Sequence, residues 1–150
     1  MLKWNGRVRV TTHTDGGFYV DEFTNQITST GLDMVRDLLS GDVTDGQIKY
    51  MAWGNSTTAA TSTQSALGSE QGRKAVTTRT AGSTGVLTTT VYLSPQDANE
   101  QIQELGWFAG PNATSTAGAG IMVARVLYSK LKTNLESIQV DREDTIGVST

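Results

Sequence analysis

The sequence has no cysteine, a single histidine and only two prolines. Without cysteine the chain can form neither disulfides nor thiolate metal sites, and His13 alone cannot build a histidine metal site. Charged residues are scarce at 18%, the formal net charge is −3, and no Lys/Arg cluster is longer than Arg73-Lys74. This composition argues against a nucleic-acid-binding protein that acts by neutralising phosphates.

Long apolar runs are missing as well. No stretch approaches the roughly 18 apolar residues of a membrane span, and residues 1–7 lack the apolar region of a signal peptide. We therefore expect a protein that is made in a cytoplasm and either stays there or leaves within a larger assembly. The 150 residues suffice for one domain, and the periodic apolar positions argue against disorder.

Residues 25–41 carry the clearest helix signal. Ser29 or Thr30 can cap the first turn, and Gly41 can take the left-handed conformation that ends a helix. The apolar side chains recur at helical spacing and predict one buried stripe: Leu32, Val35, Leu38 and Leu39. The sequence thus predicts one short helix at about residues 30–40.

The first 24 residues predict either a hairpin or an extended arm. Apolar and polar residues alternate on both sides of the turn signal Asp15-Gly16-Gly17, which favours a hairpin. An arm laid on a neighbouring subunit is the alternative. In that case the neighbour would cover Leu2 and Trp4, which would otherwise be exposed.

The remainder of the chain reads as strands. Residues 72–80 and 86–93 predict a second hairpin, and further strands are expected at 48–54, 102–109, 120–128 and 137–148. Two long polar loops, 55–66 and 110–120, are either solvated connectors or binding elements. Strands without alternating helices predict a mainly β fold, an antiparallel sandwich or barrel-like domain comprising residues 1–150.

Residues that could carry chemistry do not form a convincing site. Glu100 and Glu104 are expected on one strand face, as in glycoside hydrolysis, but no aromatic cleft accompanies them. The carboxylates of residues 141–144 alternate along a strand, so they should not converge on one ion; a solvated face balanced by Arg142 is expected. His13 has no partner for nucleophilic catalysis. The sequence therefore predicts no enzyme and no catalytic, cofactor-binding or metal-binding residue.

The aromatic pair Trp107-Phe108 suggests oligomerisation. Adjacent strand residues point to opposite faces, so one ring lies outside the core unless the second face is covered too. A partner subunit would supply that cover. The candidate interface residues are therefore Leu2, Trp4, Trp107 and Phe108.

Several motifs resemble a structural β-module of tailed bacteriophages. Residues 25–32 resemble an N-x-I-T-x-x-G-L helix start, and residues 104–108 an E-x-G-L-F strand. Residues 48–55 resemble I-x-x-I-A-x-G-T-G, although Trp53 and Asn55 replace the usual small residues. Residues 124–133 resemble the end of the module. In this order the motifs extend over residues 25–146.

The resemblance implies a virion structural protein without catalytic activity. Such modules occur in trimeric capsid decoration (cement) proteins, which bind the major capsid protein and stabilise the head. They also occur in tail-fibre and baseplate-associated proteins, where loops 55–66 and 110–120 would take part in tail assembly or host-surface binding. Either role implies a homo-oligomer, expected to be a trimer, that is located in the virion and binds neither nucleic acid nor membrane.

Overall fold

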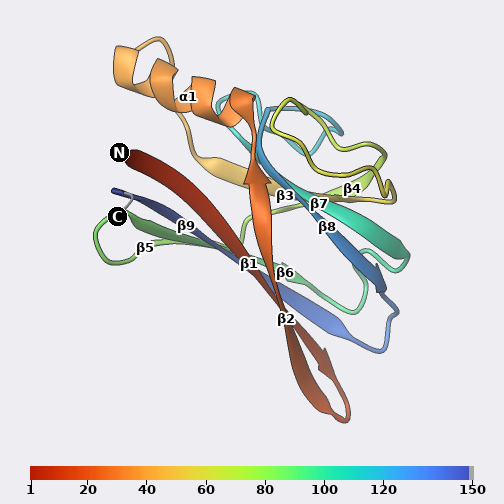
Figure 1. Ribbon diagram of the computed structural model, residues 1–150. Coiled ribbons are helices and arrows are strands. Elements are labelled where there is room, and N and C mark those ends of the chain that lie inside the picture. Colours follow the sequence, from red (N-terminus) through yellow and green to blue (C-terminus); the bar gives the residue numbers. More distant parts are fainter. Residues whose placement is uncertain (149–150) are drawn as a thin grey trace.

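The computed structural model describes residues 1–148 (Figure 1). The described residues form nine strands and one α-helix, in the order β1 (Leu2–Thr14), β2 (Gly17–Ile27), α1 (Ser29–Ser40), β3 (Ile48–Gly54), β4 (Glu70–Ala75), β5 (Thr78–Ala81), β6 (Val86–Leu93), β7 (Gln101–Ala109), β8 (Ile121–Leu131) and β9 (Ser137–Val148). This confirms the predicted mainly β fold with one short helix. No helix of the described part is long and apolar enough to cross a membrane.

All strands belong to one antiparallel sheet in the order β4-β3-β7-β8-β2-β1-β9-β6-β5. The sheet curls strongly into a half-barrel (Figure 1). One half of the sheet is β4-β3-β7-β8 and the other is β2-β1-β9-β6-β5, and two short links join them. β2 pairs with β8 only through Gln26 and Ile27, and the two end strands β4 and β5 are separated by only two residues in the chain. The predicted barrel-like architecture is therefore confirmed.

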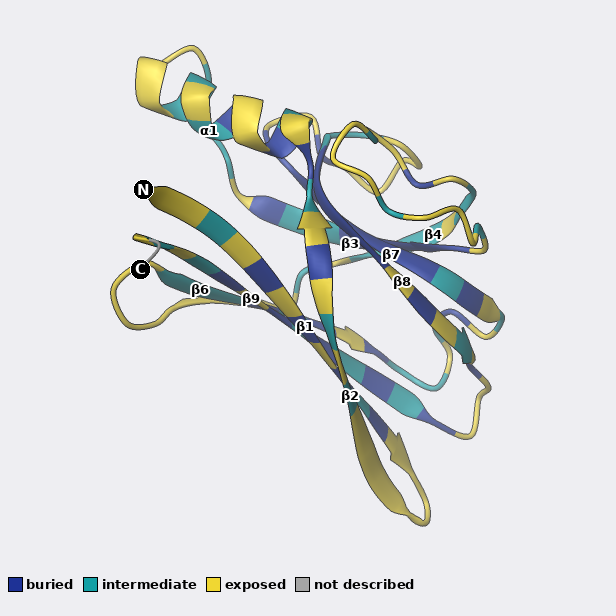
Figure 2. Ribbon diagram, in the orientation of Figure 1, coloured by how far each residue is buried: buried dark blue, intermediate teal, exposed yellow. Residues whose placement is uncertain are grey.

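The main core fills the concave side of the sheet. On β1, Val8 and Val10 are buried while Arg7 and Arg9 are exposed (Figure 2). This alternation is expected of an antiparallel strand with one covered face. Trp107 of β7 lies in the same core and is fully buried.

A second, smaller core lies on the outer face of β3, β7 and β8. Its buried members come from these strands and from the loops above them: Ala52, Leu67, Phe108, Ala113 and Met122. We call residues 55–69 the first loop and residues 110–120 the second loop. Strands β3 and β7 are consequently covered on both faces, which explains why β3 is apolar on both sides.

The N-terminal segment is a hairpin and not an arm. β1 lies between β2 and β9, and its ladder with β9 runs from Leu2 opposite Val148 to His13 opposite Ser137. Leu2–Thr14 is therefore a strand paired on both sides, which corrects the alternative of an arm laid on a neighbouring subunit. The predicted second hairpin is only half right: Thr78–Ala81 pairs with β6, whereas Glu70–Ala75 turns to the opposite end of the sheet and pairs with β3.

The helix is placed as predicted, but its cap and buried side differ. Thr28 is the N-cap, since its hydroxyl accepts a hydrogen bond from the Gly31 N–H at 3.1 Å, whereas Ser29 and Thr30 lie inside the helix. Gly41 ends the helix with φ 84°. Buried positions are Gly31 and Met34, while Leu32 of the predicted stripe is exposed.

The helix buries a different side from the predicted one because Gly31 lies close to β8. A Cβ at Gly31 would lie 2.9 Å from the Val123 Cα and 3.0 Å from its carbonyl oxygen. The helix therefore meets the sheet on its glycine side, and Leu39, also in the predicted stripe, stays 86% exposed.

We predict that Gly31→Ala destabilises the protein by about 1–3 kcal/mol, because the added methyl group must displace the β8 backbone. Leu32→Ala, at the neighbouring exposed position, should change the free energy of unfolding by less than about 1 kcal/mol. Urea denaturation of both variants measures this difference. Equal stability of the two variants would contradict the close helix–sheet contact.

Candidate functional site

The carboxylates of the sequence do not assemble a catalytic or metal site. Within residues 1–148, no three His, Asp or Glu side chains are grouped so that they could hold a metal ion. Glu100 accepts a hydrogen bond from the Trp53 indole N–H at 2.6 Å, whereas Glu104 is buried beside Arg125. The two glutamates therefore have different partners: Glu100 binds Trp53 of β3, and Glu104 binds Arg125 of β8. His13 stands beside Phe18 on the hairpin, with ring centroids 5.9 Å apart.

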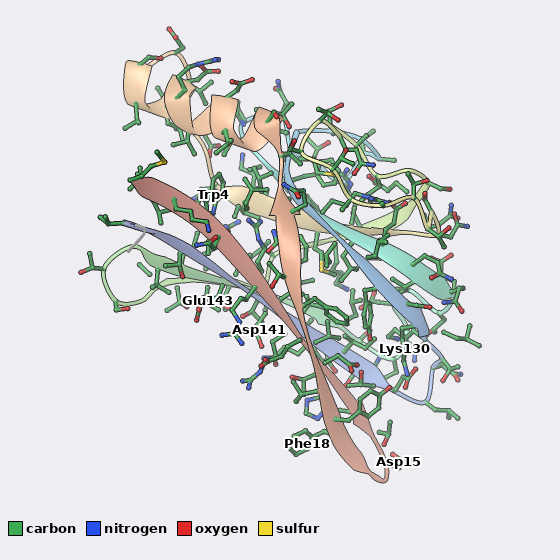
Figure 3. The ribbon with its side chains drawn as sticks, in the orientation of Figure 1. Trp4, Asp15, Phe18, Lys130, Asp141 and Glu143 are labelled. Carbon is green, nitrogen blue, oxygen red and sulfur yellow. The ribbon has the colours of Figure 1, made fainter. Side chains whose placement is uncertain are left out.

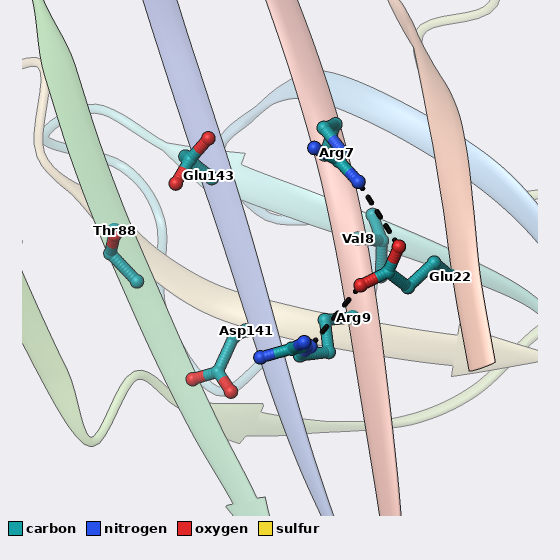
Figure 4. Close-up of a pocket in the computed structure, with 7 residues that line it drawn as sticks. All are labelled: Arg7, Val8, Arg9, Glu22, Thr88, Asp141 and Glu143. Carbon is teal, nitrogen blue, oxygen red and sulfur yellow. Dashed lines mark hydrogen bonds and ion pairs between the residues drawn. The ribbon is translucent and has the colours of Figure 1, made fainter. Parts of the chain in front are cut away.

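A charged hollow lies on the outer face of the other half of the sheet (Figure 4). Glu22 of β2 pairs there with Arg7 at 3.0 Å and with Arg9 at 3.3 Å. The lining residues come from β1, β2, β6 and β9: Arg7, Val8, Arg9, Glu22, Thr88, Asp141 and Glu143. Exposed pairs of this kind contribute little stability, and they neutralise one another. The hollow is a solvated sheet face.

The carboxylates of residues 141–144 diverge, as predicted. Asp141 and Glu143 line the hollow, whereas Asp144 lies on the buried side. Arg142 does not balance the outer carboxylates, which corrects the expectation. It is fully buried and donates to Asp144 inside the half-barrel.

A buried ion pair fastens the first loop. Glu104 of β7 and Arg125 of β8 are both fully buried, with Arg125 Nη2 2.8 Å from Glu104 Oε2. Glu104 also accepts a hydrogen bond from the Ser69 N–H at 2.8 Å, and Arg125 donates to the Gln64 side-chain oxygen at 3.2 Å. We call this pair with its loop partners the Glu104 clamp.

A second clamp is built on Arg73 of β4 and fastens the second loop. The guanidinium carbon lies 4.3 Å from the centre of the Phe108 ring. The guanidinium donates two hydrogen bonds to the Glu70 carboxylate, from Nη2 at 2.8 Å and from Nε at 2.9 Å. Its Nη1 donates to the carbonyl oxygens of Thr114 at 3.0 Å and Ala119 at 2.8 Å. Sequence reasoning missed this residue, since Arg73 has no distinguishing spacing or neighbour.

Two of the four candidate interface residues are therefore covered by the chain itself. Trp107 and Phe108 point to opposite faces as predicted, but both are fully buried, Phe108 beneath the two loops. This corrects the expectation that a partner subunit covers one of them. Leu67 anchors the first loop over the glycine at position 106.

The other two candidates lie at the end of the half-barrel near α1. Leu2 is exposed, whereas Trp4 is half-buried and donates its indole N–H to Asp144 at 2.8 Å. Both side chains are on the concave side of β1, the side that also carries Val8. Leu2 is thus accessible to a neighbouring subunit, whereas Trp4 is half-buried and bonded to Asp144 within the chain.

The tip of the β1–β2 hairpin is the most prominent exposed apolar feature. It projects beyond the rest of the sheet, with Phe18 pointing away from the body (Figure 3). Phe18 is 69% exposed, and the two residues that follow, Tyr19 and Val20, are also exposed. His13 lies beside Phe18 and Lys130 beside Tyr19, but these contacts leave all three side chains exposed.

The strand edge next to this tip is largely unpaired within the described residues. β2 pairs with β8 only through its last two residues, and from Gly17 to Asn25 its only partner is β1. Side chains bridge the diverging strands. Phe23 meets Tyr128 edge-on, with centroids 5.5 Å apart, and Lys130 Nζ lies 2.6 Å from the Tyr19 hydroxyl. The backbone edges of β2 and β8 thus make no ladder pairs with each other along this stretch.

No family model, no curated protein and no solved structure matches the chain. The candidate function consequently depends on the surfaces described above and on the resemblance of the motifs in residues 25–146.

We predict that Arg125→Met destabilises the protein by about 3–5 kcal/mol, since it leaves the Glu104 carboxylate buried without its partner. It should also expose the first loop to cleavage by a protease. The matched control is Arg7→Met, which removes an exposed pair and should cost less than about 1 kcal/mol. Denaturation and limited proteolysis measure both effects; equal stability and equal cleavage of the two variants would refute the clamp.

Proposed function

We propose that the chain is a virion structural protein of a tailed bacteriophage, a homotrimeric capsid decoration (cement) protein that binds the major capsid protein. It acts by binding and not by catalysis. The observation that carries the proposal is the projecting β1–β2 hairpin, with its exposed apolar tip and open strand edge. The motifs of residues 25–146 support the assignment to phage particles.

The hairpin tip is suited to a protein contact. Phe18 and Val20 are two residues apart in β2, so they share one face of the strand. Full burial of such a side chain contributes about 1.5–3 kcal/mol. A neighbour that covers both residues therefore gains a substantial part of the free energy needed for stable association.

The occupant that fits this surface is a second copy of the chain. Each copy offers two open strand edges, that of β2 from Gly17 to Asn25 and that of β8 from Val126 to Leu131. Strand addition between the β2 edge of one copy and the β8 edge of the next would be a head-to-tail contact. Contacts of this type form a ring when the rotation between successive copies closes, and a trimer is such a ring.

The fastened loops behind the hairpin support a role in stabilising the head. The Glu104 clamp and the Arg73 clamp fix both long loops on the outer face of the sheet. Few long segments are then free to move when a neighbouring subunit pulls on the domain. A protein that stabilises a pressurised shell benefits from this property.

A tail-fibre or baseplate component is the alternative proposal. It is supported by the proximity of the two loops, since Leu67 of the first loop and Ala113 of the second loop pack in the same small core. Loops fixed in advance lose less entropy on binding a host surface. Saturable binding of the protein to host cells, but not to phage heads, would favour this role.

For the decoration protein, we predict that wild-type protein in solution has about three times the 16.0 kDa mass of the chain. The double variant Phe18→Ser/Val20→Thr should become monomeric and lose at least about tenfold in affinity for undecorated heads, equivalent to 1.4 kcal/mol. Light scattering and a head-binding assay measure the two results.

The matched control is Tyr92→Ser, which removes a half-exposed aromatic side chain from β6, away from the hairpin. It should keep both the trimer and the affinity for heads. A monomeric wild-type protein, or a hairpin variant that behaves like the control, would contradict the proposal.

A further inference from the structure

An apolar cavity of about 400 Å³ lies between α1 and the strand ends across the half-barrel and opens to solvent. Its apolar wall comes from both sides: Met34, Val35 and Leu38 of α1, and Trp4, Leu87 and Ile146 of the strands. α1 contacts β8 at Gly31 in its first turn, and its later turns extend above the ends of β1 and β9 (Figure 1). The cavity is the space beneath these turns.

The wall also contains one arginine, Arg79 of β5. Its Nε donates to the Ile48 carbonyl at 2.6 Å, which holds the side chain beside the cavity. Its two Nη groups have no hydrogen-bond or ion-pair partner among the described residues. The residue is exposed, so its guanidinium lies where the cavity meets solvent. A ligand that enters the cavity can therefore reach two free pairs of N–H donors at the entrance.

The carboxylates near Arg79 are already paired with other cations. Asp144, the one acidic residue of the wall, is only 3% exposed and pairs with the buried Arg142. Asp45 lies close enough to Arg79 to interact with its charge, but it pairs with Lys49 at 2.7 Å. Both pairs are neutral, so Arg79 leaves one uncompensated positive charge at the entrance of an apolar cavity.

We propose that this cavity binds a single-chain aliphatic carboxylate of medium length, with its chain beneath α1 and its carboxylate on Arg79. The volume lies within the range of small-molecule sites, which combine apolar walls with a few polar groups that orient the ligand. A guanidinium with free Nη groups matches the geometry of a carboxylate. The site is separate from the hairpin and goes beyond the structural role proposed above.

The test compares two ions that have the same chain and opposite charges. Full-length wild-type protein is titrated in a calorimeter with decanoate and with decyltrimethylammonium, each below the concentration at which it forms micelles. We expect one saturable site per chain and an affinity for decanoate about fivefold or more above that for the cation, because only decanoate can pair with Arg79. The net charge of −3 would by itself favour the cation.

Three results would overturn the proposal. The first is heat without saturation, which indicates nonspecific binding, and the second is equal or tighter binding of the cation. The third is binding to phosphatidylglycerol vesicles without binding of free decanoate, which would indicate a membrane surface as the ligand.

A pair of arginine variants tests the proposed head-group contact. Arg79→Gln should weaken decanoate binding by about fivefold and leave binding of the cation no weaker than in the wild-type protein. The matched control is Arg36→Gln on the exposed side of α1, where the guanidinium pairs with Asp33 and Asp37 outside the cavity. It should bind decanoate like the wild-type protein. Equal decanoate affinities of the two variants would contradict the role of Arg79.

Two tryptophan substitutions on α1 test the chain-binding part of the cavity. Val35→Trp fills the cavity and should weaken decanoate binding by about tenfold or more, whereas Leu32→Trp, at an exposed position outside the wall, should leave it unchanged. Equal binding by these two variants would overturn the site even if Arg79→Gln fails to fold.

A further result separates this proposal from the assembly of the protein. The hairpin variant Phe18→Ser/Val20→Thr should bind decanoate like the wild-type protein. If only that variant binds decanoate, a second copy covers the cavity in the wild-type protein, and the ligand site is refuted. If the wild-type protein is monomeric and binds decanoate as expected, the ligand site stands and the proposed trimer fails.

Discussion

The buried ion pair between Glu104 and Arg125 is the interaction on which the outer half of the structure depends. Two charges away from water are stable only when they pair and their remaining hydrogen-bonding groups are satisfied. Here Ser69 donates to the carboxylate and Gln64 accepts from the guanidinium, so the first loop lies across β7 and β8. This in turn places Leu67 in the second core, beside Phe108. A polar interaction thus determines how an apolar surface is covered.

The sequence predicted the helix and the strands better than the contacts that each of them makes in the fold. Alternation along β1 and the glycine-rich turn identified the hairpin, and Gly41 identified the helix end, because these signals are local. The sequence placed Trp107 and Phe108 on opposite faces, but it did not indicate that the second face is covered by Leu67 of the first loop and Ala113 of the second loop. Arg73, which fastens the second loop, has no local pattern that distinguishes it from a surface charge.

The same limit applies to the surfaces that suggest function. The helix faces the sheet with Gly31 because its backbone lies against β8 there. A cavity lined by Met34, Leu38 and Asp144 lies beneath its later turns. Neither feature follows from helical spacing alone. Likewise, Leu2 and Trp4 looked like an arm, yet they belong to an integral strand, and the projecting part of the segment is the tip around Phe18.

These features describe a rigid β domain with an exposed hairpin at one end and an apolar cavity beneath its helix. The most direct measurement of the proposed role is a cryo-EM reconstruction of the phage particle. The account predicts density for this half-barrel on the outer surface of the head, in groups of three, with the β1–β2 hairpins at the contacts within each group. Density at the tail tip only, or three copies that meet through another face, would contradict it.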